Sequence, residues 1–186
     1  MNKEETNIKE KSPPDKEAGT KKKKKRTATS YAIEFFIKIG VTAIAVWALC
    51  TFVISININH SNSGYPMIKD GDLCISYRLA KLVLSDEISY RHDGKVSFGR
   101  VVAKSGDIVD IREDAIIVNG YDVFEDTVYP TTAEGAKIEF PYTVPQDSVF
   151  VLNDYRSDVN DSRSFGALPV KEALGKVILV IRRREI

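Results

Sequence analysis

The chain has few of the side chains that build metal sites or disulfide frameworks. It contains two cysteines and two histidines in 186 residues. Cys50 lies inside a long apolar run and Cys74 lies well outside it, so we expect two free thiols rather than a disulfide. His60 and His92 do not cluster with either cysteine. We therefore predict no metal site, and we expect no cofactor.

Excess positive charge is confined to the start of the chain. Residues 1–30 contain ten basic and five acidic side chains, a net charge of +5, whereas the remainder contains 17 and 21, a net charge of −4. This balance argues against nucleic-acid binding by the folded part. Residues 1–30 also lack apolar periodicity, so we predict a disordered tail.

The basic run at residues 21–26 has three interpretations. It can bind nucleic acid, bind anionic membrane lipid, or hold the tail on the cytoplasmic side of a membrane. Its position just before an apolar segment favours the third, because positive charge near a membrane span stays inside the cell. Some attraction to anionic lipid follows from the same charge.

Long apolar runs are also scarce, and the sequence has one. Residues 35–56 are almost wholly apolar, with Lys38 as the one charged side chain. About 20 such residues cross the hydrocarbon core as a helix. A cleaved signal peptide has a shorter apolar segment of about 7–15 residues, and a helix of a soluble core has a polar face. We predict a membrane anchor at residues 31–56, with a cytoplasmic N-terminus and an extracellular domain at 57–186.

The sequence beyond the anchor has the period-two alternation that is typical of β-strands. Strands are predicted at 73–77, 96–103, 108–111, 115–118, 142–144, 149–152 and 175–181. Asn119-Gly120 indicates a hairpin turn, because both residues tolerate positive φ. Residues 170–174 have a helical pattern, and 121–141 are predicted as a loop or small hairpin. The expected fold class is mainly β, a folded sheet behind one transmembrane helix.

Three motifs follow the anchor in order. Residues 60–72 read His-Ser-Asn-Ser-Gly-Tyr-Pro-Met-Ile-Lys-Asp-Gly-Asp, and residues 99–107 read Gly-Arg-Val-Val-Ala-Lys-Ser-Gly-Asp. Residues 151–156 read Val-Leu-Asn-Asp-Tyr-Arg, and residues 161–166 read Asp-Ser-Arg-Ser-Phe-Gly. These motifs resemble those of type I signal peptidases, Ser-Met-x-Pro-Thr-Leu-x-x-Gly-Asp, Lys-Arg-Val-x-x-x-Pro-Gly-Asp and Gly-Asp-Asn-Arg-x-x-Ser-x-Asp-Ser-Arg-x-x-Gly. The resemblance covers residues 35–182.

The resemblance implies a serine nucleophile activated by a lysine that burial keeps neutral. Ser63 takes the nucleophile position, or Asn62 after a one-residue slip, but Gly99 stands at the position of the general-base lysine. Lys95 lies on the same strand face as Gly99, about 13 Å away along the strand, beyond its reach. Val159 replaces the serine that supports the lysine in the motif. Three other cationic residues are also excluded as the base. Lys104 lies on the opposite strand face, Lys69 is expected to be solvated, and Arg100 stays protonated.

The resemblance also suggests roles for further residues of the motifs. Ser61 is a candidate oxyanion donor. The candidate peptide-groove residues are Tyr65, Pro66, Phe98 and Val101, although Gly64 and Met67 replace the Met and Thr of the motif. A structural role, tying strands together, is expected for Asp154, Arg156, Asp161, Ser162 and Arg163.

Two functions are open at this point. The chain most resembles the signal-peptidase-like proteins of Gram-positive bacteria that lack the catalytic dyad and assist sortase-dependent pilus assembly. That resemblance implies a non-catalytic factor whose partners are a pilin precursor or another secreted precursor, sortase and membrane lipid. The alternative is an active signal peptidase that uses Ser63 with an unusual base, either His60 or a water held by Asp154. Gly99 argues against the alternative, because loss of a general base costs about 10²–10⁴ in rate.

Overall fold

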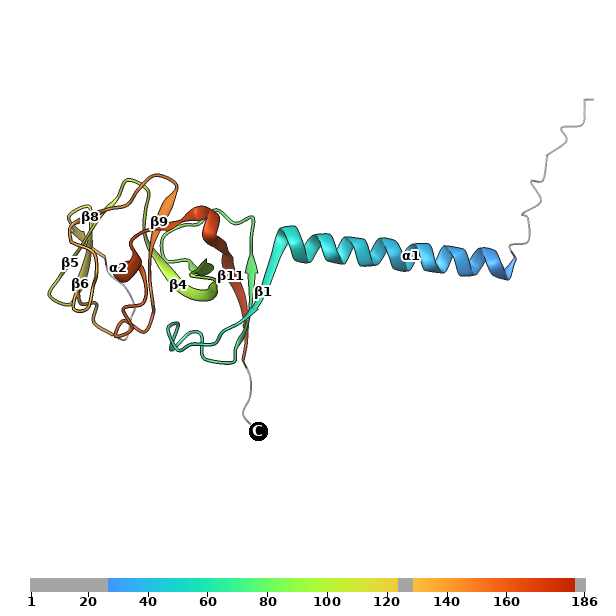
Figure 1. Ribbon diagram of the computed structural model, residues 1–186, viewed down its shortest axis with the longest axis horizontal. Helices are drawn as coiled ribbons and strands as arrows, with labels where there is room; N and C mark the ends of the chain where they lie inside the picture. The colour runs from blue at the N-terminus through green and yellow to red at the C-terminus, as the bar shows by residue number, and fades with distance from the viewer. Residues whose placement is uncertain (1–26, 124–128, 183–186) are drawn as a thin grey trace, which may run out of the picture. The chain divides into compact units, whose positions relative to one another are not determined.

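The computed structural model describes residues 27–123 and 129–182, so most of the predicted tail lies outside the described residues. Helix α1 (Ala28–Ala48) continues into a π-helical turn, η1 (Leu49–Val53). Together they form a 26-residue apolar segment with a mean hydropathy of 2.0, none of which is buried. At 1.5 Å per residue this segment is about 39 Å long, enough to cross a membrane. Figure 1 shows α1 as one continuous helix.

The apolar helix ends earlier than the apolar run predicts. Helical structure stops at Val53, and Ile54 begins strand β1 (Ile54–Ile58). Ile54 and Ile56 pair with Tyr77 and Ile75 of β2 (Leu73–Tyr77), so the end of the apolar run belongs to the sheet. Helical structure therefore stops three residues before the predicted boundary at residue 56, because apolar composition does not distinguish a membrane helix from an apolar strand that directly follows it.

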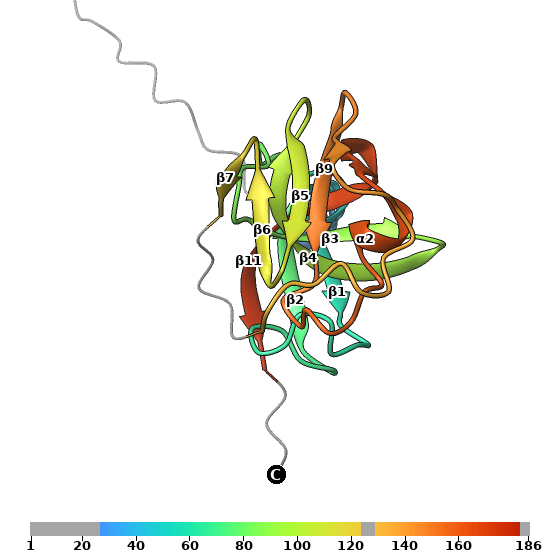
Figure 2. The same ribbon diagram turned by 90° about the vertical axis from the view of Figure 1, so that its left-hand side faces the viewer.

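The rest of the described chain forms two antiparallel sheets, which confirms the predicted mainly β class. The larger sheet has the order β1-β2-β11-β3-β4-β9-β10 and the smaller β7-β6-β5-β8. The remaining strands of the larger sheet are β3 (Glu87–His92), β4 (Lys95–Lys104), β9 (Ser148–Leu152), β10 (Leu168–Pro169) and β11 (Ala173–Ile181). The smaller sheet contains β5 (Ile108–Arg112), β6 (Ala115–Val118), β7 (Tyr121–Asp122) and β8 (Tyr142–Thr143). Figure 2 shows β5, β6 and β7 next to one another.

Two local predictions need correction. The helical pattern at 170–174 yields only a single 3-10 turn, η2 (Val170–Glu172), because Ala173 already pairs with Tyr90 of β3. Sequence reasoning also missed β3 and the short helix α2 (Ser162–Phe165). The segment predicted as a loop or hairpin starts with β7, and its residues 124–128 lie outside the described residues.

Three hydrophobic clusters lie within and between the sheets. Val101 belongs to a cluster with Tyr90 and Val151, and Phe98 packs with Ile68 and Cys74. Both Phe98 and Val101 are fully buried, so these two predicted groove residues are core residues instead. Alternation along β4 explains the result for Phe98, which faces the side opposite to its neighbour Ser97. Cys50 and Cys74 are free thiols, as predicted.

A buried ion pair organises the segment that follows β9. Asp161 and Arg163 both have fully buried side chains, and Arg163 Nη2 lies 2.7 Å from Asp161 Oδ2. Arg163 Nε and its backbone N–H donate to Asp161 Oδ1, each at 3.0 Å. The backbone N–H of Asn153 donates to Asp161 Oδ2, also at 3.0 Å. The pair therefore satisfies its own charges and fixes where the chain runs after β9.

A second charged group consists of Arg100, Asp154 and Glu87. Arg100 donates to both carboxylate oxygens of Asp154, at 2.8 and 2.6 Å. Glu87 lies 3.4 Å from Arg100 Nη2, but neither of its carboxyl oxygens accepts a hydrogen bond from the described residues. Burial, and then the negative charge of Asp154, raise the pKa of Glu87 from 4.5 to about 8, against an opposing effect of Arg100. Glu87 is therefore mostly protonated at neutral pH.

Removing the arginine of the buried pair should destabilise the fold strongly. In full-length protein in detergent, we expect Arg163→Met to lower the free energy of unfolding by about 3–5 kcal/mol, because the Asp161 carboxylate stays buried without its partner. The matched control is Arg112→Met, since Arg112 pairs with Asp110 at 2.8 Å but is largely exposed, and its loss should cost less than about 1 kcal/mol. Denaturant unfolding followed by circular dichroism measures both. Equal losses in the two variants would contradict this role for Arg163.

Glu87 predicts a pH dependence of stability. Its pKa is higher in the folded chain than the ordinary 4.5, so the folded state binds the proton more tightly, and stability should fall as pH rises from about 5 to 8. Glu87→Gln should flatten this dependence and raise the unfolding midpoint at pH 8 relative to the parent protein. Glu134→Gln, in an exposed loop, is the control and should leave the dependence intact. Parallel pH curves for Glu87→Gln and the parent would show that Glu87 does not titrate in this range.

Candidate functional site

The Ser63 loop connects β1 to β2, and hydrogen bonds hold its hydroxyl away from any base. Ser63 is 6% exposed, and its Oγ lies 2.7 Å from Ser61 Oγ. Ser61 Oγ in turn donates to Asn59 Oδ1 at 3.3 Å, and an amide oxygen can only accept. The Ser63 hydroxyl therefore donates to Ser61, which is neutral. The backbone N–H of Tyr155 donates to the carbonyl of Ser63 at 2.9 Å and ties the loop to the segment after β9.

Gly64 is required by the way this loop packs. A Cβ atom at Gly64 would lie 2.9 Å from the Cβ of Ile68, closer than real side chains approach. Ile68 is almost fully buried against Phe98 and Cys74, so it has little room to move away. The Met that occupies this position in the signal-peptidase motif does not fit here. The loop next to Ser63 therefore packs directly against Ile68, with no side chain at position 64.

The surroundings of Gly99 are tightly packed around the position of the missing lysine. A Cβ atom there would lie 3.2 Å from the carbonyl oxygen of Leu152 and 3.4 Å from Cε1 of Tyr90. Tyr90 is fully buried, and its ring also contacts Phe165. Burial, and then the charges of Asp161 and Glu87, raise the pKa of Tyr90 far above its usual range, so its phenol stays protonated. Tyr90 therefore fills space beside Gly99 without providing a base.

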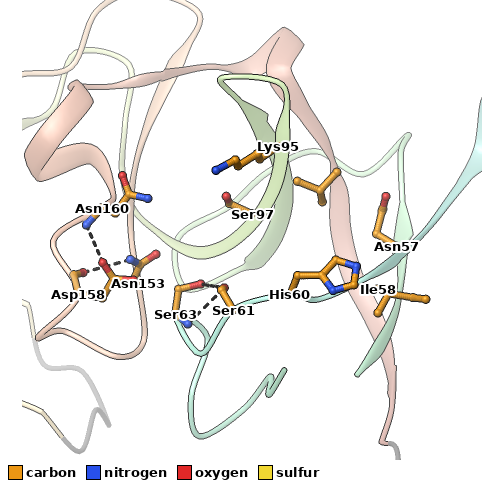
Figure 3. Close-up of a pocket in the computed structure, with 11 residues that line it drawn as sticks. Asn57, Ile58, His60, Ser61, Ser63, Lys95, Ser97, Asn153, Asp158 and Asn160 are labelled. Atoms are coloured by element: carbon orange, nitrogen blue, oxygen red, sulfur yellow. Dashed lines mark hydrogen bonds between the residues drawn. The ribbon is translucent and has the colours of Figure 1, made fainter. Parts of the chain in front are cut away.

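A pocket of about 530 Å³ lies beside Ser63 (Figure 3). Its lining comes from β1, the Ser63 loop, the start of β4 and the segment after β9: Asn57, Ile58, His60, Ser61, Ser63, Lys95, Val96, Ser97, Asn153, Asp158 and Asn160. Most of these side chains are polar and can donate or accept hydrogen bonds. The pocket is thus suited to a ligand that is itself rich in hydrogen-bonding groups.

The structure brings together some of the sequence-predicted residues and separates others. Ser61, Ser63 and His60 line the pocket, but the His60 ring points away from Ser63 towards Asn57 and Ile58 (Figure 3). Tyr65 is partly exposed, with Lys69 Nζ 5.4 Å from its ring centre, and Pro66 is exposed. Neither Tyr65 nor Pro66 lines this pocket.

Lys95 reaches the pocket, although sequence reasoning discounted it. Lys95, Ser97 and Gly99 share one face of β4 by alternation, and the first two line the pocket. Figure 3 shows the Lys95 ammonium directed towards Asn160, on the far side of Ser97 from Ser63. This places a positive charge at one end of the pocket, away from the serine hydroxyls. Lys95 is therefore positioned to bind an acceptor rather than to activate Ser63.

Sequence reasoning missed Asn153 as a pocket residue. Its side chain is 1% exposed, and its Nδ2 donates to the carbonyl of Asp158 at 3.1 Å. The sequence signal that could have identified Asn153 is its departure from the family motif, which has glycine at this position.

Asp154, the residue considered as the holder of a catalytic water, directs both carboxylate oxygens to Arg100. Within residues 27–123 and 129–182, no group of three or more His, Cys, Asp or Glu side chains has metal-binding geometry.

Comparison with known proteins agrees with these motifs. A family model described as signal peptidase, peptidase S26, matches residues 32–182. Signal peptidase I of Bacillus caldolyticus is 28% identical over 174 residues, covering 85% of this chain and 92% of that protein. A protein named inactive signal peptidase IA, from Staphylococcus aureus strain Mu50, is 26% identical over 161 residues, covering 79% of this chain and 90% of the relative.

Two further matches cover less of this chain. Thylakoidal processing peptidase 1 of Arabidopsis thaliana is 28% identical over 135 residues, or 63% of this chain, and the match spans only 39% of the plant protein. A solved structure of a signal peptidase I from Enterococcus faecalis is 25% identical, with a TM-score of 0.46, covering 53% of this chain and 98% of its own. The family match spans most of the sequence, from the apolar helix to the last strand. The chain therefore belongs to the signal peptidase family, peptidase S26.

Proposed function

We propose that this chain is a non-catalytic member of the signal peptidase family that binds a polypeptide in the pocket beside Ser63. The observation that carries the proposal is the environment of the Ser63 hydroxyl, which bonds to the neutral Ser61. A serine needs an adjacent base to act as a nucleophile, and none of the described residues near Ser63 provides one. The Staphylococcus aureus relatives named inactive signal peptidase IA support the same interpretation.

The apolar helix and the charge pattern suggest where this binding takes place. The helix Ala28–Val53 anchors the chain in a membrane, and the basic run at 21–26 keeps the N-terminus in the cytoplasm. The β domain then lies outside the cell, where secreted precursors emerge. The resemblance to pilus assembly proteins makes a pilin precursor the preferred ligand, with sortase as the enzyme that uses it.

An active peptidase is the second candidate, favoured by the Bacillus caldolyticus relative named signal peptidase I. It needs a base other than the lysine of the motif. His60 would have to rotate towards Ser63, because its ring points away (Figure 3). A water on Asp154 would compete with Arg100, which bonds to both carboxylate oxygens. Both routes require rearrangement of groups that the structure holds elsewhere.

The purified full-length protein in detergent should bind a signal-peptide-bearing pilin precursor without cutting it. We expect no cleavage by either the parent or Ser63→Ala, and similar binding by both, because the hydroxyl is not needed as a nucleophile. Gel analysis of the precursor measures cleavage, and surface plasmon resonance measures binding. A true signal peptidase that cuts the same precursor is the control. Cleavage that disappears in Ser63→Ala would establish the second candidate instead.

Replacing Gly99 by lysine should not rebuild the enzyme. We expect Gly99→Lys to give no cleavage, because its Cβ atom would lie 3.2 Å from the Leu152 carbonyl oxygen and 3.4 Å from Tyr90, so these buried neighbours must shift to admit it. Overpacking of this kind typically costs about 1–3 kcal/mol, so the thermal midpoint should fall by several degrees. Circular dichroism gives the midpoint, and the precursor assay gives the activity. Serine-dependent cleavage, or an unchanged midpoint, would show that the site still accommodates a lysine.

A further inference from the structure

Asn153 presents an unused hydrogen-bond acceptor to the pocket. Its side chain is 1% exposed, and its Oδ1 has no hydrogen-bond partner among the residues that the structure describes. Leaving such a buried group unpaired costs about 1–3 kcal/mol. The cost is removed when a ligand, or an ordered water, donates a hydrogen to this oxygen. A ligand that donates a hydrogen bond to this oxygen should therefore be bound more tightly.

The orientation of the amide is fixed by its neighbours. The Nδ2 atom faces the carbonyl of Asp158, which can only accept, so the nitrogen must occupy that end. Figure 3 accordingly shows the Asn153 oxygen on the side away from Asp158, facing into the pocket. The backbone is also held on both sides, because Asn153 N–H donates to Asp161 and Arg156 Nε donates to the Asn153 carbonyl at 2.8 Å. The acceptor is thus preorganised by buried charged groups.

The position of Asn153 relates it to the missing lysine. Arg100 pairs with Leu152 in the ladder between β4 and β9, so Asn153 follows directly at the point where Gly99 lies. The motif of the family has lysine and glycine at these two positions, whereas this chain has glycine and asparagine. Where the family motif has a polar side chain on the strand that corresponds to β4, this chain has one directly after β9, and it is a neutral amide. An amide cannot take a proton from Ser63, but it can recognise a donor.

The other pocket groups indicate the class of ligand. The hydroxyl oxygens of Ser61 and Ser63 can still accept hydrogen bonds, and Lys95 offers a cation for a carbonyl or carboxylate at the far end. An extended polypeptide presents main-chain N–H and C=O groups in alternation, which matches acceptors and a cationic donor within one pocket. We propose that Asn153 is a specificity residue whose Oδ1 accepts a hydrogen bond from a main-chain N–H of the bound polypeptide. This inference rests on the proposed function, because it names a contact within the same pocket.

The test uses a synthetic 20-residue peptide that spans the signal-peptide end and the first mature residues of the same pilin precursor. Its affinity for full-length protein in detergent is measured by fluorescence anisotropy. Asn153→Leu, which keeps a similar size, should weaken binding about three- to tenfold, the usual effect of losing one hydrogen bond. Gln146→Leu is the matched control, because Gln146 is an exposed amide that does not line the pocket, and its replacement should leave the affinity unchanged.

A series of N-methylated peptides identifies the donor. Methylation of one main-chain nitrogen should weaken binding to the parent protein and have no further effect on Asn153→Leu. Asn153→Gly, which carries the residue of the family motif, repeats the measurement if Asn153→Leu fails to fold. Parent-level affinity in either folded variant, or the same N-methyl pattern in parent and variant, overturns this inference and leaves peptide binding intact. No binding of the peptide or the whole precursor by the parent overturns both proposals.

Discussion

The buried ion pair between Asp161 and Arg163 is the interaction on which the pocket depends. The segment from residue 153 to residue 161 contains no strand or helix, so its backbone groups need partners from elsewhere. Asp161 accepts the N–H of Asn153, and Arg163 Nη2 donates to the carbonyl of Asp158. These two bonds fix both ends of the stretch that lines the pocket. The backbone N–H of Tyr155, in the same stretch, donates to the Ser63 carbonyl. The Asp161–Arg163 pair therefore helps to position two parts of the pocket lining, the segment after β9 and the Ser63 loop.

The loss of catalysis, as we propose it, has a steric part as well as a chemical part. A lysine base has to be buried to stay neutral, and burial needs an apolar space large enough for its side chain. Here the ring of Tyr90 and the Leu152 carbonyl occupy the surroundings of Gly99. The chain therefore lacks the lysine, and the surroundings of its position are tightly packed. Ser63 remains, but its hydroxyl has become one link in a chain of neutral hydrogen bonds through Ser61 to Asn59.

Sequence reasoning predicted the mainly β fold, the apolar helix and the family, because these rest on long patterns. Period-two alternation and a 26-residue apolar segment each average over many residues, so single exceptions do not hide them. Strand β3 was missed although Ile88 and Tyr90 alternate with polar residues, because the strand is short and has only these two apolar side chains. The end of the apolar helix was hard to place for a different reason, since Ile54 and Ile56 are apolar in a helix or a strand.

The pocket was harder to predict than the fold, because its residues meet only across strands. Phe98 and Val101 were assigned to a groove from their place in a motif, yet both face the core. Lys95 was discounted by its distance from Gly99 along β4, but a pocket that extends across several elements does not require every group to reach one atom.

Asn153 shows the same principle most clearly. In the sequence, Asn153 is only a position where the family motif has glycine, and Gly99 is only a position where the family motif has lysine. The register between β4 and β9 places the two departures side by side, where a small residue on one strand faces a polar side chain after the other. On our proposal the two changes act together: the base is absent from β4, and a buried acceptor stands opposite it, held by hydrogen bonds from Asn153 N–H to Asp161 and from Arg156 to the Asn153 carbonyl.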